Sequence, residues 1–244
     1  MGTNKDAHSM TIWDHLGELR KRVIIILLTV MVAAVICFAY VDDILEFLLK
    51  PAPNLQLIFT TPPEALVAQV RLALQAALIV TLPLNLIQVL LFIVPALEET
   101  EKKVILPFFL AMNVLFFLGV AFSYYMVIPF AIRFFMGFGT ESLTPLFSIG
   151  NYISFITSLL LSFGLIFQIP LVFWFLGLIG LVSSAFLRNN RKFAILVIVV
   201  VAAIMTPPDV VSQVLMAIPL IFLYEAGMVL VWVTERQKRR TAKV

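Results

Sequence analysis

The sequence predicts an all-α membrane protein: six transmembrane helices with both termini in the cytoplasm, forming a concave bundle with an extracytoplasmic cap. The first observation behind this fold class is a composition that is 62% hydrophobic and 13% charged, whereas soluble domains are about 45–50% apolar and about 25% charged. The second is that the apolar residues stand in long blocks rather than in the alternating pattern of a membrane barrel. Together they exclude a soluble enzyme, a disordered chain and a fibrous repeat.

Six apolar segments approach the roughly 20 residues that a transmembrane helix needs. They cover residues 23–41, 72–94, 104–129, 152–180, 193–206 and 213–233. Basic residues at 20–22 would also suit a secretory signal peptide, but the first apolar run is too long and no small-residue cleavage pattern follows it. We therefore expect one six-span membrane domain over 10–236, an added or disordered segment over 1–9, and a basic cytoplasmic tail over 237–244.

The basic residues predict the orientation of these segments. With the N-terminus on one side and six spans, fourteen lysines and arginines fall on that side and three on the other. The fourteen are Lys5, Arg20, Lys21, Arg22, Lys102, Lys103, Arg188, Arg191, Lys192, Arg236, Lys238, Arg239, Arg240 and Lys243; the three are Lys50, Arg71 and Arg133. Because cytoplasmic loops are enriched in basic residues, both termini are predicted to be cytoplasmic.

The fifth segment is unusually short. Its fourteen residues, 193–206, would make a helix of about 21 Å, against a hydrocarbon core of about 30 Å. Pro207 and Pro208 then end the helix. A short sixth helix would bring Glu225 to the cytoplasmic interface, so we expect a locally thinned bilayer at this corner.

The two long outer loops, residues 42–71 and 130–151, are expected to pack as a cap over the helix ends, with breakers such as Pro51. Prolines also lie in or beside the spans, at Pro83, Pro107, Pro129, Pro170 and Pro219. Bent helices would make the bundle concave. Ordinary tolerance of proline in membrane helices explains the same pattern, and both interpretations remain open.

Signatures of enzymatic chemistry are missing from the sequence. There is no phosphate-binding G-x-x-x-x-G-K-[ST] loop, no H-E-x-x-H and no G-x-S-x-G. The single cysteine, Cys37, lies in an apolar run, and the two histidines, His8 and His15, both lie near the N-terminus. We therefore expect no catalytic residues, no metal, no cofactor and no nucleic-acid partner.

Several polar residues lie inside the predicted spans, where they are costly. Gln168 lies in the fourth span, Gln213 and Glu225 in the sixth, and a stripe of five follows one face of the second: Arg71, Gln75, Thr81, Asn85 and Gln88. Such residues form either a functional site or hydrogen bonds between helices. For the stripe we favour hydrogen bonding between helices; for Glu225 both interpretations remain open.

Acidic residues interrupt the basic cytoplasmic side at Glu18 and at Glu98, Glu99 and Glu101. Neighbouring carboxylates could clamp guanidinium groups through bidentate, charge-assisted hydrogen bonds. The alternative is a solvated turn with Glu18 paired to a nearby Lys or Arg, and composition alone favours that alternative.

Four motifs, in order, resemble those of the TatC family, the polytopic subunit of the twin-arginine protein translocase. They are H-L-G-E-L-R-K-R at 15–22, F-I-V-P-A-L at 92–97 with Glu101 following, F-G-L-I-F-Q-I-P at 163–170, and T-P-P-D-V-V-S-Q at 206–213 running on to Tyr224 and Glu225. Each motif is weak alone, but four at matching spacing across residues 13–233 are specific.

The resemblance implies a receptor that reads the paired arginines of signal peptides on folded export substrates. It further implies oligomeric complexes with single-span TatA- and TatB-type partners in the cell inner membrane, driven by the proton-motive force. Signal-peptide contacts would fall to Glu18, Glu101, Arg20, Phe92 and Pro95, the outer cap would include Pro51, and partner helices would dock at Thr206, Asp209, Ser212 and Gln213.

Two positions depart from the family pattern. The family usually has glutamate where this chain has Gln168, and glutamine keeps the shape but does not titrate. It often has an aromatic residue at the position of Glu98. Two other classes of protein have less support. A small-solute transporter would show inverted repeats, but residues 20–130 and 131–240 are not similar to each other. An intramembrane hydrolase is weaker still, since no aspartate lies inside a predicted span.

Overall fold

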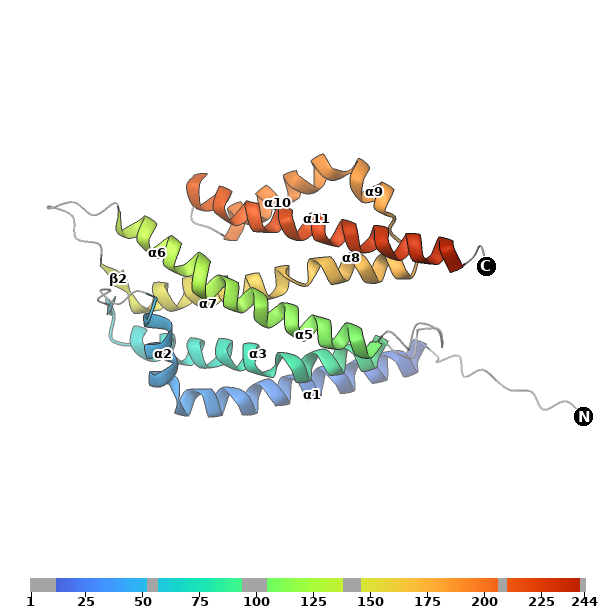
Figure 1. Ribbon diagram of the computed structural model, residues 1–244. Helices are drawn as coiled ribbons and strands as arrows, with labels where there is room; N and C mark the ends of the chain where they lie inside the picture. The colour runs from blue at the N-terminus through green and yellow to red at the C-terminus, as the bar shows by residue number, and fades with distance from the viewer. Residues whose placement is uncertain (1–11, 52–56, 94–104, 138–145, 206–209, 242–244) are drawn as a thin grey trace, which may run out of the picture.

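The computed structural model describes residues 12–51, 57–93, 105–137, 146–205 and 210–241, and within them the chain is almost entirely helical (Figure 1). The elements in order are α1 (Ile12–Ala39), α2 (Val41–Leu49), β1 (Leu57–Ile58), α3 (Glu64–Ile93), α5 (Ile105–Phe122), the π-helix η2 (Ser123–Val127), α6 (Ile128–Met136), β2 (Phe147–Ser148), α7 (Ile149–Ile166), α8 (Ile169–Leu178), α9 (Ser184–Asn189), α10 (Arg191–Met205) and α11 (Val210–Thr241).

Five helical stretches in the described residues are long and apolar enough to cross a membrane. They are His15–Ala39, Glu64–Phe92, Ile105–Met136, Ile149–Leu178 and Met216–Lys238. The outward surfaces of these helices carry many exposed large apolar side chains, which are unfavourable in water; Val35 is 71% exposed and Phe222 is 72% exposed. The predicted class, a helical multi-span membrane protein, is confirmed at this level.

The remaining predicted span is α10, which has 15 residues and is therefore about 22 Å long. The fifth helix is thus as short as the sequence indicates. The expectation of a short sixth helix is wrong, because α11 continues for 32 residues. Its C-terminal part, residues 234–241, is polar and basic. Arg, Lys, Gln and Glu have high helix propensity, so the helix continues beyond the apolar segment.

The helices form a layered bundle in which α7 and α8 occupy the middle (Figure 1). α1 pairs with α3, while α7 packs against both α3 and α5, and α8 packs against α11. Half of the apolar window in Ile149–Leu178 is buried, compared with 6–33% in the other four spans. The start of α1 and the end of α11 lie at the same end of the bundle (Figure 1).

Prolines act differently at different positions. Pro83 and Pro219 lie inside continuous helices, as the tolerance interpretation predicts. Pro170 begins α8 directly after the break that ends α7 at Ile166. Pro129 begins α6 after the π-helix η2; because proline has no N–H, the preceding turn loses a hydrogen bond there and widens.

The end of the bundle opposite the termini is closed by α2 and by a parallel pair of two-residue strands, Leu57 opposite Phe147 and Ile58 opposite Ser148. Tyrosine hydroxyls hold α2 in place: Tyr124 donates to the carbonyl oxygen of Phe47 at 2.7 Å, and Tyr152 to that of Leu48 at 2.8 Å. These carbonyls belong to the last turn of α2, where the usual donors four residues later are missing; the Phe47 carbonyl also accepts from the backbone N–H of Lys50 at 3.3 Å.

The carboxylate of Glu64, at the start of α3, joins the remaining parts of this closed end. It accepts hydrogen bonds from the backbone N–H of Thr60 at 2.6 Å, from the backbone N–H of Gly150 at 3.2 Å, and from the hydroxyl of Ser148. Half-buried Pro51 forms the turn directly after α2. The side of the membrane that this end faces stays a prediction.

Two glycines let α5 and α7 approach closely. A Cβ on Gly119 would lie 2.5 Å from the carbonyl oxygen of Phe163, and one on Gly164 would lie 2.5 Å from Cε2 of Phe116. Both phenylalanines are fully buried. Small residues serve this purpose in membranes because close backbone approach maximises van der Waals contact between helices.

We predict that Gly119→Ala destabilises the protein by about 1–3 kcal/mol, because the new methyl group must push a backbone carbonyl aside. Thermal unfolding in detergent measures this as a lower Tm. Gly17→Ala is the matched control, since a Cβ there meets nothing within 4 Å and alanine favours helix by about 1 kcal/mol. Equal Tm values for the two variants would contradict the close contact.

Candidate functional site

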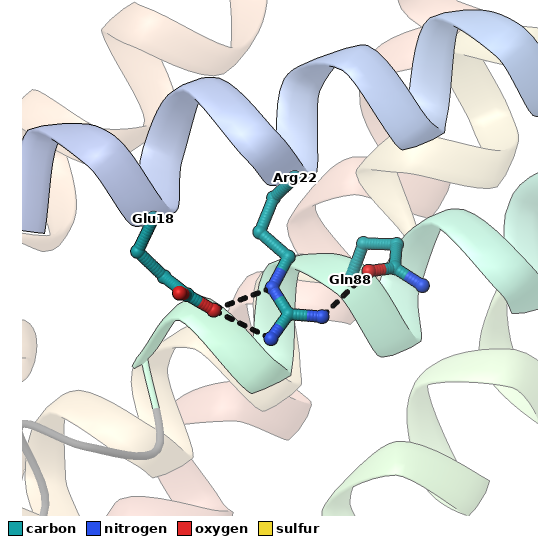
Figure 2. Close-up of polar contacts among 3 residues, drawn as sticks. All are labelled: Glu18, Arg22 and Gln88. Atoms are coloured by element: carbon teal, nitrogen blue, oxygen red, sulfur yellow. Dashed lines mark hydrogen bonds and ion pairs between the residues drawn. The ribbon is translucent and has the colours of Figure 1, made fainter.

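Glu18 on α1 forms an ion pair with an arginine of its own helix (Figure 2). Its Oε1 accepts from Arg22 Nε at 2.8 Å and from Arg22 Nη2 at 2.5 Å. The remaining guanidinium nitrogen, Nη1, donates to Oε1 of Gln88 on α3 at 2.9 Å. Side-chain exposure is 27% for Glu18 and 20% for Arg22, so the pair is largely shielded from solvent.

Local sequence explains the pair. Residues four apart lie on the same face of a helix, which brings Glu18 next to Arg22, and the long contact between α1 and α3 brings Gln88 to the same face. One turn nearer the start of α1, the His15 ring stacks on the Phe92 ring with centroids 4.4 Å apart. Phe92 lies in the last turn of α3. Glu18 therefore lies between two contacts that join α1 to α3, the His15–Phe92 stack and the Arg22–Gln88 hydrogen bond.

The structure brings together only some of the predicted signal-peptide residues. Glu18 and Phe92 lie at one end of the α1–α3 pair, and Arg20 is exposed on α1. Glu101 and Pro95, like Glu98 and Glu99, lie outside the described residues. His15 and Gln88 were not expected as parts of this site; spacing along one helix predicts the Glu18–Arg22 pair, but contacts between helices leave no signal in one sequence.

The described hydrogen bonds of the polar stripe lie mostly within α3, which differs from the favoured interpretation of bonding between helices. Gln88, which accepts from Arg22 of α1, is the member that does join two helices. The Thr81 hydroxyl donates to the Ala77 carbonyl oxygen at 2.7 Å, and Asn85 Nδ2 donates to Thr81 Oγ1 at 3.0 Å. Arg71 is exposed at the other end of the helix. Of this stripe, only Gln88 contacts the candidate site through a described side chain.

Gln168 lies at the break between α7 and α8 and bridges to a third helix. Its Nε2 donates to the carbonyl oxygen of Met112 on α5 at 3.1 Å and to that of Gly164 at 3.4 Å. Its Oε1 is buried without a hydrogen-bond partner among the described residues. The side chain therefore acts as a donor here, which an ionised carboxylate could not do.

Glu225 on α11 is held by the start of α10: Oε1 lies 2.7 Å from Nη2 of Arg191. The contact is an ion pair without a well-directed hydrogen bond. Between the two interpretations left open for Glu225, this geometry supports the structural one, because the pair ties the start of α10 to the middle of α11.

The predicted partner-docking residues belong to the stretch of sequence between Met205, where α10 ends, and the first turn of α11. Thr206 and Asp209 lie outside the described residues, and Ser212 is placed only by its backbone in α11. Gln213 Nε2 donates to the carbonyl oxygen of Val199 at 3.1 Å and joins the two helices. Exposed apolar side chains flank this stretch, with Ile204 79% and Val210 74% exposed.

In the described part of the chain, no three His, Cys, Asp or Glu side chains gather in a way that could hold a metal ion. Together, long apolar helices, ion pairs at the basic end and a half-buried carboxylate that holds a guanidinium describe a multi-pass helical membrane protein with a charged site at one end of its bundle.

Comparison with known proteins defines the class further. The family model for TatC, Sec-independent protein translocase protein, matches residues 14–219. The chain belongs to the TatC family and is a subunit of the Sec-independent, twin-arginine translocase.

Relatives and solved structures agree with this membership. The TatC protein of Helicobacter pylori is 43% identical over 210 residues, which covers 86% of this chain and 84% of the relative. That of Aquifex aeolicus is 37% identical over 240 residues, covering 96% and 100%. A crystal structure described as the twin arginine translocase receptor TatC has a TM-score of 0.79 at 36% identity, covering 91% of this chain and 99% of its own. These relatives are named as components of protein transport rather than as enzymes.

We predict that Gln168→Glu destabilises the protein by about 1–3 kcal/mol at neutral pH, because an ionised carboxylate would face two carbonyl oxygens without a proton to donate. Gln168→Met is the matched variant; it removes the donor but also the unpartnered Oε1, so its cost should be smaller. Chemical or thermal unfolding in detergent compares the two. A glutamate variant as stable as the methionine variant would contradict the assigned hydrogen bonds.

Proposed function

We propose that this chain is the receptor subunit that binds the twin-arginine signal peptides of folded export substrates, in the cell inner membrane and with both termini in the cytoplasm. It acts without catalysing a chemical reaction, spans the membrane six times, and recruits single-span TatA- and TatB-type subunits for transport driven by the proton-motive force. The basic residues and the shared end of α1 and α11 support the orientation.

The observation that carries the proposal is the forked contact between Glu18 and the guanidinium of Arg22 (Figure 2). Two nitrogens of one guanidinium reach the carboxylate, which is the geometry that distinguishes arginine from lysine. Pairing of Glu18 with a nearby arginine is also what the alternative interpretation expects; the support for the proposal is that the surroundings of Glu18 accommodate a guanidinium in this forked geometry. Because Arg22 engages one of the two carboxylate oxygens, Glu18 has further capacity as an acceptor.

Binding then proceeds as an exchange. A signal-peptide arginine takes the place of Arg22 on Glu18, while Arg22 keeps its hydrogen bond to Gln88. The second arginine of the peptide pairs with Glu101, and Phe92 and Pro95 provide the apolar surface beside the pair. Partial burial of Glu18 strengthens its charge pair relative to one exposed to water.

We predict that Glu18→Gln combined with Glu101→Gln weakens binding of a twin-arginine signal peptide by about 10- to 100-fold, the usual range for a charge-assisted bond. The measurement is peptide affinity for the protein in detergent or nanodiscs. Replacing the peptide's arginines with lysines should weaken binding to the unaltered chain but not to the double variant. A double variant that still discriminates arginine from lysine would overturn the site.

Arg22→Gln is the informative counterpart in the same measurement. If Arg22 competes with the peptide for Glu18, removing its charge should tighten peptide binding, whereas a purely structural Arg22 would leave the affinity unchanged or lower it. Lys21→Gln, at an exposed position on the same helix that is not among the predicted signal-peptide contacts, serves as the charge-matched control.

On this proposal, partners are recruited where the sequence passes from α10 to α11, the stretch that contains Thr206, Asp209, Ser212 and Gln213. The support is the apolar side chains exposed there and the short α10, beside which the bilayer must thin. These features favour a membrane helix of similar length as a neighbour.

We predict that a cysteine at Val210, with Cys37 replaced by Ser, crosslinks to a single cysteine in the membrane helix of a TatA- or TatB-type partner. Gel mobility after mild oxidation reports the crosslink. Val35→Cys on the exposed face of α1, which is 71% exposed, is the control and should crosslink far less. Equal crosslinking at the two positions would count against docking at this stretch.

A further inference from the structure

A cavity of about 650 Å³ lies between α9 and the basic C-terminal part of α11, on the side of the bundle opposite α1 (Figure 1). On the α9 side it is lined by Ser183, Ala185 and Arg188; on the α11 side, by Val229, Trp232 and Arg236. None of these residues belongs to the signal-peptide or partner-docking sets.

Along α11 the lining changes from apolar to aromatic to basic. A phospholipid changes in the same order, from acyl chain to glycerol to phosphate. Val229 lies within the apolar part of the helix, Trp232 follows one turn later, and Arg236 one turn beyond that. Trp232 is 22 residues from the start of α11, or about 33 Å, which is close to the thickness of the hydrocarbon core. Tryptophan at this depth is typical of the membrane interface.

The cavity presents two guanidinium groups for an anion. Arg236 lies over the Trp232 ring, with Cζ 5.3 Å from the ring centroid, and Arg188 is in the last turn of α9. Among the described residues, neither arginine lies within ion-pair distance of a carboxylate. Guanidinium groups bind phosphate oxygens through paired N–H donors.

The acidic residue of the lining, Glu235, is engaged elsewhere. Its Oε1 accepts from the backbone N–H of Ser184 at 3.0 Å and its Oε2 from the Ser184 hydroxyl at 2.5 Å. Glu235 therefore fastens α9 to α11. The Tyr224 hydroxyl, which donates to the Leu187 carbonyl oxygen at 2.7 Å, fastens the same two elements from the other side. These contacts hold the walls of the cavity in place.

From this arrangement we infer that the cavity between α9 and α11 binds an anionic phospholipid. Arg188 and Arg236 hold its phosphate, Trp232 lies at the glycerol level, and Val229 contacts the beginning of an acyl chain. The lipid would come from the cytoplasmic leaflet, whose anionic lipids attract basic protein segments to the membrane surface.

The test is a titration of the purified protein in neutral detergent with phosphatidylglycerol or phosphatidylcholine, followed by native mass spectrometry. We expect phosphatidylglycerol to bind preferentially, and Arg188→Gln combined with Arg236→Gln to weaken that binding by about 30-fold, since each basic residue contributes about five-fold and the two effects multiply. Lys50→Gln combined with Arg133→Gln removes the same charge from the opposite end and should leave binding within about two-fold. Loss in both double variants, or in neither, would overturn the site.

A second variant separates a built site from general surface charge. Ala185→Trp fills the cavity without altering its charge, and it should weaken phosphatidylglycerol binding while the Tm stays within a few degrees. Unchanged lipid binding in a folded Ala185→Trp variant would overturn the proposal. Inorganic phosphate should not displace the lipid at equal concentration; displacement would show a site for free phosphate and would likewise overturn the lipid assignment.

Discussion

The architecture depends on how helices hold together where the surrounding solvent is as apolar as their own side chains. Burial of apolar surface contributes little to association within a bilayer, so close contact and hydrogen bonding must supply it. The α5–α7 contact meets this need with Gly119 and Gly164, which bring each backbone against a buried phenylalanine of the other helix. Gln168 adds a bond from the α7–α8 break to the backbone of α5. The central position of α7 follows from these contacts, and the outer helices are arranged around it.

The same constraint governs the charged groups. Glu18 and Glu225 both lie in helices that belong to membrane spans, and in each case an arginine of this chain neutralises the carboxylate. An acid left alone at such a depth would be costly. For the proposed receptor, this means that recognition exchanges one guanidinium for another at a carboxylate already removed from bulk water. Discrimination between arginine and lysine then depends on the forked geometry, because total charge barely changes on exchange.

Much of the fold could be predicted from the sequence because apolar blocks mark membrane helices directly. The limits of the helices could not: α3 begins at Glu64 rather than near residue 72, and α11 continues past residue 233 to Thr241. Apolar content reports where lipid surrounds a helix, whereas helix propensity and caps decide where the helix ends. The π-helix before Pro129 likewise depends on backbone geometry that composition does not record.

The candidate site shows the same division. Glu18 could be singled out because it is an acid among basic residues, and its pairing with Arg22 follows from the spacing of four. The Gln88 contact and the stacking of His15 on Phe92 depend on the register between α1 and α3, which local sequence does not specify. Charge also marked Glu101, together with its neighbours Glu98 and Glu99, and the resemblance to a family then selected Glu101 among them and added Pro95.

The length of α10 has a consequence for the bilayer as an elastic sheet. In the proposed six-span arrangement, α10, at about 22 Å, compresses the lipids around it, and the energy of that deformation grows with the perimeter over which it extends. Any second helix of similar apolar length shares the compressed zone and reduces its perimeter. The attraction that results needs no complementary side chains, so α10 would sort neighbouring helices by length before any specific contact is made.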